Sequence, residues 1–197
     1  MIDRTAEAPP ARRMRPDVQR SLDALLTAAA EVFASDGVDA PVRRITAKAG
    51  VGAGTLYRHF PQRSDLITAV FRHEVDACAE AAPALADQYE PVEALTRWLR
   101  HLARFVAAKR GLKSALHSGD PAYQSLPAYF MERFVPALTQ LLDAAAAAGD
   151  IRSDVIPYDL LRAISGIVEP DDDAYTQRMI ALLVDGLRYG THPALPK

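Results

Sequence analysis

Five cationic side chains lie within residues 41–63, a stretch that contains no Asp or Glu. They are Arg43, Arg44, Lys48, Arg58 and Arg63. Guanidinium and ammonium groups bind phosphate through Coulomb attraction and counterion release, and Arg also pairs with guanine. A solvated protein face usually mixes the two signs of charge. The absence of any carboxylate over this stretch therefore indicates a surface for nucleic acid.

The charge of the whole chain hides this basic segment. The 197 residues have a formal net charge of −2, which taken alone argues against a nucleic-acid binder. Residues 1–63 carry ten Lys or Arg and seven Asp or Glu, whereas residues 64–197 carry thirteen and eighteen. The net charge is therefore +3 in the first part and −5 in the second.

Two short helices joined by a glycine turn are predicted around these cations. Val42, Ile45 and Ala49 share one face of the first helix, residues 49–52 form the turn, and the second helix spans about residues 53–60. This is the helix-turn-helix pattern, in which the second helix enters the major groove of DNA.

A helical wheel of residues 53–60 separates an inner from an outer face. The inner, buried face is expected to carry Ala53, Leu56 and Phe60. The outer face and its flanks carry Gly54, Thr55, Tyr57 and Arg58. An arginine, two hydroxyl groups and a small residue that permits close approach suit contact with bases and phosphates.

The glycine-rich run at residues 50–54 has a second interpretation, the phosphate-binding loop of a dinucleotide site. Such a loop follows an apolar β-strand. Residues 42–49 are instead basic and have helical periodicity, so this interpretation is not favoured.

Helical periodicity also dominates the rest of the chain. The apolar stripe of residues 22–33 predicts a first helix that ends at Gly37, and a longer helix begins near Arg63. After Pro83 the chain is expected to become a larger helical unit, in which an apolar stripe from Val92 to Val106 predicts a helix that ends at Gly111. Further helices are expected after Asp120-Pro121, from Pro127 to Gly149, at 157–168 and at 172–189. We therefore predict an all-α fold of about nine helices.

The region around the turn resembles the N-terminal domain of TetR-family transcription repressors. The resemblance rests on Ile45-Thr46-Ala47-Lys48-Ala49-Gly50-Val51 and on Gly54-Thr55-Leu56-Tyr57-Arg58-His59-Phe60, and it covers about residues 18–70. Residues 91–168 resemble the effector domain of a subgroup more loosely. The resemblance implies a homodimer that places two recognition helices in successive major grooves of a near-palindromic double-stranded DNA operator.

The resemblance also implies roles for single residues. Arg43 would touch bases or phosphate, and Arg63 would hold phosphate. Family members often carry Ser or Thr where this chain has Pro41-Val42, and Ser where it has Gly52, so affinity is expected to depend more on the arginines. The predicted DNA contacts are Arg43, Arg44, Gly54, Thr55, Tyr57, Arg58, His59 and Arg63.

Aromatic and apolar residues crowd the middle helices, as either an ordinary core or the wall of a small-molecule pocket. The candidate pocket residues are Phe71, Trp98, His101, Phe105, His117, Tyr123, Phe130 and Phe134. The last two helices resemble the family's dimer interface, and an internal core contact is the alternative. The candidate interface residues are Ile164, Ile167, Ile180, Leu183 and Leu187.

The sequence contains no catalytic or metal-binding constellation. His-Glu-x-x-His and Gly-x-Ser-x-Gly are both missing, and Asp171–Asp173 fits a helix start better than a metal site. With Cys78 alone, neither a disulfide nor a four-cysteine zinc site can form within one chain. Residues 1–15 lack the apolar core of a signal peptide, and no stretch approaches the roughly 18 apolar residues of a membrane span. We expect a cytoplasmic protein without enzymatic activity, cofactor or membrane contact.

The sequence thus predicts a ligand-responsive regulator of transcription, a repressor released from its operator by a small-molecule effector. The expected parts are a flexible basic arm (1–17), a helix-turn-helix domain (18–62), a ligand-binding and dimerisation domain (63–190) and a tail (191–197). A helical interaction protein that keeps the fold but has lost specific DNA binding is the alternative.

Overall fold

The computed structural model describes residues 16–109, 118–169 and 171–189. Its elements are α1 (Pro16–Asp36), α2 (Val42–Ala49), α3 (Ala53–His59), α4 (Arg63–Gln88), α5 (Pro91–Ala108), the 3-10 helix η2 (Pro121–Tyr123), α7 (Leu126–Ala147), α8 (Pro157–Ile167) and α9 (Asp173–Tyr189). These residues contain no β-strand, so the all-α prediction is confirmed, with eight α-helices in the described ranges.

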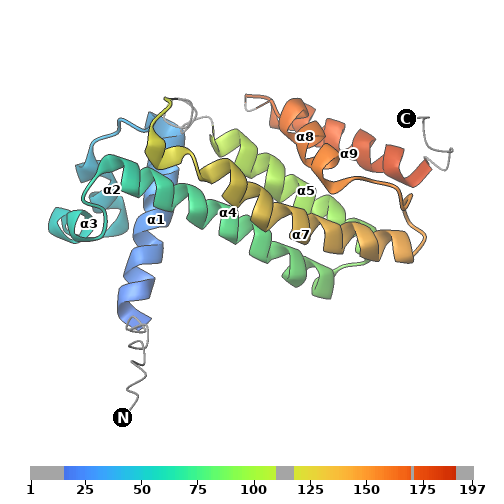
Figure 1. Cartoon of the computed structure of the whole chain (residues 1–197), viewed down its shortest axis with the longest axis horizontal. Helices are drawn as coiled ribbons and strands as arrows, with labels where there is room; N and C mark the ends of the chain where they lie inside the picture. The colour runs from blue at the N-terminus through green and yellow to red at the C-terminus, as the bar shows by residue number, and fades with distance from the viewer. Residues whose placement is uncertain (1–15, 110–117, 170, 190–197) are drawn as a thin grey trace, which may run out of the picture.

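Helices α1, α2 and α3 form one end of the molecule (Figure 1). Their small core is made by buried residues that include Phe33, Ile45 and Leu56. Gly37 ends α1 as predicted, and Gly50 caps α2; both have positive φ values, of 79° and 66°, which glycine adopts without steric cost. The turn between α2 and α3 therefore has the backbone that a helix-turn-helix requires.

The buried face of α3 is narrower than the helical wheel predicts. Leu56 and Phe60 are buried as expected, whereas Ala53 is exposed. Ala53 is the first residue of this seven-residue helix, and the contact with the core is made one turn further along.

Helix α4 begins at Arg63, as predicted, with a capping box in which the Gln62 amide donates to Asp65 Oδ2 at 2.9 Å. The prediction that a new helical unit starts after Pro83 is wrong, because α4 continues through this residue to Gln88. A proline inside a helix removes one backbone hydrogen bond. The helix persists because its packing continues around the proline: Ala82 is fully buried.

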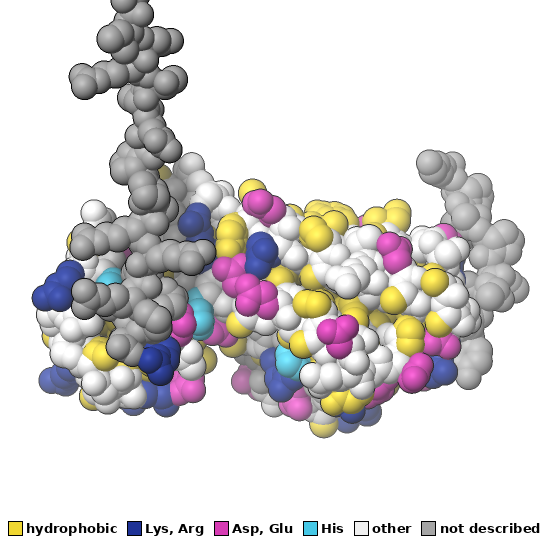
Figure 2. All heavy atoms as spheres, turned by 90° about the horizontal axis from the view of Figure 1, so that it is seen from below, with side chains coloured by type: hydrophobic (Ala, Val, Ile, Leu, Met, Phe, Trp, Pro, Cys, Tyr) yellow, Lys and Arg dark blue, Asp and Glu magenta, His cyan; other side chains and the backbone are white. Residues whose placement is uncertain are grey.

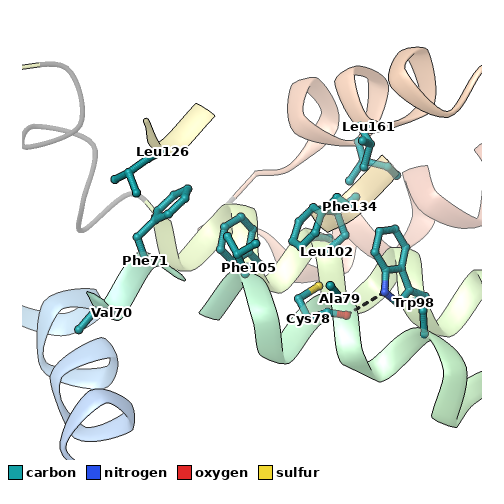
Figure 3. Packing of buried hydrophobic residues seen from close by; sticks show 14 of the residues in the cluster. Val70, Phe71, Cys78, Ala79, Trp98, Leu102, Phe105, Leu126, Phe134 and Leu161 are labelled. Atoms are coloured by element: carbon teal, nitrogen blue, oxygen red, sulfur yellow. Dashed lines mark hydrogen bonds between the residues drawn. The ribbon is translucent and has the colours of Figure 1, made fainter. Parts of the chain in front are cut away.

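The body of the molecule consists of α4, α5 and α7 packed side by side, with α8 and α9 against α5 and α7 (Figure 1). The centre of its core is aromatic (Figure 3): the indole N–H of Trp98 donates to the Cys78 carbonyl at 2.9 Å. Phe134 packs edge-on against both Trp98 and Phe105, with ring centres 5.6 and 5.4 Å apart. No described helix combines the length and apolarity that a membrane span requires.

The predicted helix start at Asp120-Pro121 is present, but it opens only the three-residue η2. Asp120 Oδ1 accepts a hydrogen bond from the Ala122 amide at 2.9 Å, which is the expected cap. The chain then starts α7 at Leu126. Tyr123 of η2 is buried, and η2 packs against α4.

Candidate nucleic-acid interface and ligand cavity

The tertiary structure divides the five cations of residues 41–63 into three groups. Two of them form ion pairs with carboxylates of α1: Arg44 Nη1 lies 2.5 Å from Asp36 Oδ2, and Lys48 Nζ lies 2.6 Å from Glu31 Oε2. The carboxylates that this segment lacks are therefore supplied by the preceding helix. Such exposed pairs contribute only about 0–1 kcal/mol each, so an incoming phosphate can replace them.

Arg63 is held by the backbone instead of facing outward. Its Nε donates to the Val38 carbonyl at 2.8 Å and its Nη2 donates to the Ala40 carbonyl at 2.6 Å, while its guanidinium carbon lies 5.1 Å from the centre of the Phe33 ring. Burial lowers the pKa of this guanidinium. The prediction that Arg63 serves as a phosphate ligand misses this role, because its donors fasten α4 to the connection between α1 and α2.

Arg43 on α2 and Arg58 on α3 are both exposed, and neither has an ion-pair partner among the described residues. Tyr57, beside Arg58, is 54% exposed. On the face of the molecule seen in Figure 2, Lys and Arg side chains lie at several places on the end that carries α2 and α3, together with a few Asp and Glu side chains. The body mixes basic, acidic and apolar side chains.

The remaining predicted DNA contacts lie on the same end of the molecule. Gly54 is exposed, and a Cβ atom added there would meet nothing within 4 Å. Thr55 and His59 are half-buried on α3. The outer face of α3 is therefore open at its first turn and polar along its length.

The body contains a cavity of about 340 Å³ between α4, η2, α7 and α8. Its walls are mainly apolar and aromatic, and they include Phe71, Tyr123, Phe130, Met131 and Tyr158. A second cavity of about 380 Å³ shares Phe130, Met131 and Tyr158 with the first and extends along α8. Volumes of this size are typical of small-molecule sites.

Three of the predicted pocket residues line the first cavity: Phe71, Tyr123 and Phe130. His101 and Phe105 line a different cavity of about 320 Å³, between α4 and α5. There, burial and the nearby Arg104 lower the pKa of His101. His117 lies outside the described residues.

Trp98 and Phe134 are wrongly predicted as walls of a ligand cavity. Both are fully buried in the core of the body. Trp98 faces inward because its N–H is satisfied by the Cys78 carbonyl (Figure 3). Cys78 is buried as expected, and burial raises the pKa of its thiol to about 12.

Lys109 also lines the first cavity, although it is not among the predicted pocket residues. Its Nζ lies 5.3 Å from the centre of the Phe71 ring and 5.5 Å from that of Phe130. Burial lowers the pKa of this ammonium group. The available signal is its spacing: Lys109 follows Phe105 by four residues and so ends the apolar stripe of α5.

A polar cluster between α4 and α7 was also missed. The hydroxyl of Tyr129 on α7 donates to the carboxylate of Asp76 on α4 at 2.7 Å, and Arg133 Nε donates to the same carboxylate at 2.7 Å. Burial and the hydrogen bond to Asp76 raise the pKa of Tyr129. The cluster fastens the middle of α4 to α7.

The predicted interface residues differ in where they lie. Ile164 and Ile180 are fully buried within the chain, so the prediction that they face a second subunit is wrong, and the alternative of an internal core contact applies to them. Ile167, Leu183 and Leu187 are partly buried and pack on the same core. The large apolar side chains exposed on α8 and α9 are Tyr158, Tyr175 and Leu182.

Comparisons with known proteins agree with this architecture. Residues 25–70 match the family described as bacterial regulatory proteins, tetR family, and residues 90–189 match the C-terminal domain of SbtR-like transcriptional regulators. A TetR transcriptional regulator from Streptomyces coelicolor is 42% identical, with a TM-score of 0.75 over 84% of this chain and 97% of that chain.

Two further relatives are more distant. An HTH-type transcriptional regulator of Staphylococcus aureus is 26% identical over 88% of this chain and 81% of its own length. A gamma-butyrolactone receptor, described as ArpA-like, is 25% identical, with a TM-score of 0.60 over 89% of this chain and 92% of that chain.

Among the described residues, no group of three or more His, Cys, Asp or Glu side chains is placed to hold a metal ion. The chain belongs to the TetR family of transcriptional regulators, which are DNA-binding proteins and not enzymes.

Proposed function

We propose that this TetR-family chain is a repressor that leaves a near-palindromic operator when a small molecule enters its helical body. The observation that carries the proposal is the pair of exposed arginines on the two helices of the helix-turn-helix, Arg43 and Arg58, which have no ion-pair partner among the described residues. Free guanidinium groups bind phosphates and pair with guanine without first breaking an internal ion pair. Gly54 and Tyr57 complete this surface, with Thr55 and His59 at its edge.

Helix α4 supplies the connection between the two sites. Arg63 fastens its first turn to the residues that precede α2, and Phe71, two turns further along, lines the cavity. A ligand between Phe71 and Phe130 would bias the position of α4 against α7, and α4 would carry α2 and α3 with it. Operator and ligand would then weaken each other's binding by the same factor.

The repressor acts as a homodimer in this proposal, because two recognition helices must reach half-sites about 34–36 Å apart. Support comes from α9, where Tyr175 and Leu182 are exposed seven residues apart and so share one helical face. Leu182→Glu is expected to give a monomer in sedimentation at micromolar concentration. A dimer that tolerates this change would exclude this face as the interface.

The DNA surface is tested by fluorescence anisotropy with the intergenic DNA upstream of the gene. Arg58→Ala is expected to weaken binding by about 10- to 100-fold. Arg43→Ala is expected to weaken binding to all sequences alike and to lower the salt slope by about one for each subunit.

The matched control is Arg104→Ala, which removes the same charge from an exposed position on α5. It should bind DNA like the wild type. If Arg43→Ala and Arg58→Ala also bind like the wild type, the assigned surface is wrong. If the wild-type chain shows no salt-dependent binding to this DNA, the alternative of an interaction protein without specific DNA binding replaces the proposal.

A further inference from the structure

One of the described residues that line the cavity beside Phe71 carries a positive charge. Lys109 follows the last residue of α5, and its ammonium group lies over the rings of Phe71 and Phe130. The other residues that line this cavity are Phe71, Tyr123, Leu126, Pro127, Phe130, Met131 and Tyr158, none of which carries a charge at neutral pH.

This ammonium group has no carboxylate partner among the described residues. Glu74 lies across a small cavity of about 20 Å³ that Lys109 also lines, but the two form no ion pair. The aromatic faces attract the charge, yet they accept none of the three hydrogen bonds that an ammonium donates. A half-buried cation in this setting is incompletely solvated, and a bound anion would supply what is missing.

We propose that Lys109 binds the anionic group of the effector, and that the effector is a monocarboxylate with a long apolar body. The inference rests on the proposed function only in treating this cavity as the effector site. A monoanion fits because Lys109 is the one cation among the described residues that line the first cavity, whereas a phosphate dianion is usually held by several donors or by the fork of an arginine.

The shape of the two adjoining cavities determines the form of the ligand's apolar body. The second cavity continues from the first past Phe130, Met131 and Tyr158 and reaches Ser165 and Gly166 on α8. Leu161 and Arg162 also line it. A ligand whose carboxylate meets Lys109 at the end of α5 therefore extends its apolar body along α7 towards α8. An unbranched chain of about ten carbons buries most of its surface in such a channel, at about 0.8 kcal/mol for each CH₂.

The test compares acids with their alcohols on the full-length protein in the absence of DNA. Isothermal titration calorimetry is run with octanoate, decanoate and dodecanoate and with the corresponding primary alcohols. The wild type is expected to bind at least one acid about ten-fold or more tightly than its alcohol. Lys109→Met keeps an unbranched side chain, one atom shorter and without charge, and is expected to erase this preference while leaving the affinity for the alcohol within about two-fold.

The control is Arg104→Met, which removes a cation from the same helix without touching either cavity. It should retain the preference for the acid. The inference is overturned if no acid binds better than its alcohol, or if Lys109→Met retains the preference. Operator release is measured separately by anisotropy: an acid that binds through Lys109 without releasing DNA contradicts the proposed repressor mechanism and leaves the assignment of Lys109 intact.

Discussion

On α3 an aromatic and a cationic side chain face solvent, whereas in the helical body Trp98 and Lys109 face inward. Tyr57 of α3 is 54% exposed, whereas Trp98 of α5 is fully buried and bonded to a carbonyl. Arg58 of α3 has no described partner and lies in water, whereas Lys109 at the end of α5 lies over two aromatic rings. The same chemical groups therefore serve different ends at the two sites.

The hydration of the cations determines which kind of anion each site selects. A cation in water is already hydrated, so Arg43 and Arg58 remain exposed at little cost until they bind a polyanion and release its condensed counterions. A cation among aromatic rings has lost part of its hydration, so Lys109 favours an anion that arrives with an apolar body. The outer surface suits a long charged polymer, and the inner one suits a small amphiphilic molecule.

The largest effect is expected from removing an inward aromatic. Trp98→Ala should lower the free energy of unfolding by about 3–5 kcal/mol, because it leaves a cavity and removes the hydrogen bond from the indole to the Cys78 carbonyl. Tyr57→Ala should change it by no more than about 0.5 kcal/mol. Urea unfolding followed by circular dichroism measures both. If Trp98→Ala does not fold, Trp98→Phe gives a smaller loss in the same direction, and equal losses at the two positions would contradict the comparison.

Arg63 and Arg58 offer a comparison of two arginines five residues apart. Arg63→Met removes hydrogen bonds to the Val38 and Ala40 carbonyls and should destabilise the chain by about 1.5–3 kcal/mol. Arg58→Met is expected to leave stability within about 0.5 kcal/mol of wild type, since it removes no internal contact. Thermal unfolding measures the stability of both variants. Comparable losses of stability would mean that Arg58 makes stabilising contacts in the folded chain.

The polar cluster between α4 and α7 should contribute less. Tyr129→Phe deletes one hydroxyl that donates to Asp76 and should cost about 1 kcal/mol of stability. The control is Tyr57→Phe on the exposed face of α3, for which no change is expected in the absence of DNA. Denaturant midpoints at equal m-values make the comparison, and a neutral Tyr129→Phe would remove this cluster as the fastening of α4.

The smallest effect concerns pH. Burial and Arg104 lower the pKa of His101 in the folded chain below its ordinary value of 6.5. Below that value the unfolded chain binds more protons at this site than the folded chain, so acid lowers stability. Between about pH 7.5 and 5.5, His101→Gln should therefore lose less stability than the wild type. Parallel losses in the two proteins across this range would show that His101 does not contribute.

Local patterns in the sequence were sufficient for the helices and the turn. Val42 and Ile45, the glycine at position 50 and the buried Leu56 predict the helix-turn-helix because their spacing and backbone preferences act over a few residues. Pro83 predicts a break between helical units, but α4 continues through it because the packing around Ala82 outweighs the local cost of a proline. Periodicity indicates that Trp98 and Ile164 face inward, but it does not tell a packed core from the wall of a cavity.

The amino-acid sequence by itself determined the all-α fold, the helix-turn-helix and the concentration of positive charge in residues 41–63, since composition and periodicity are properties of neighbouring residues. Only the tertiary structure decided which cations are free. Asp36 and Glu31 of α1 form ion pairs with Arg44 and Lys48 of α2. The carbonyls of Val38 and Ala40 accept hydrogen bonds from Arg63. It alone brought Lys109 over Phe71 and Phe130. Those contacts join residues far apart in the chain, and their energies depend on distance and burial, which spacing along a sequence does not contain.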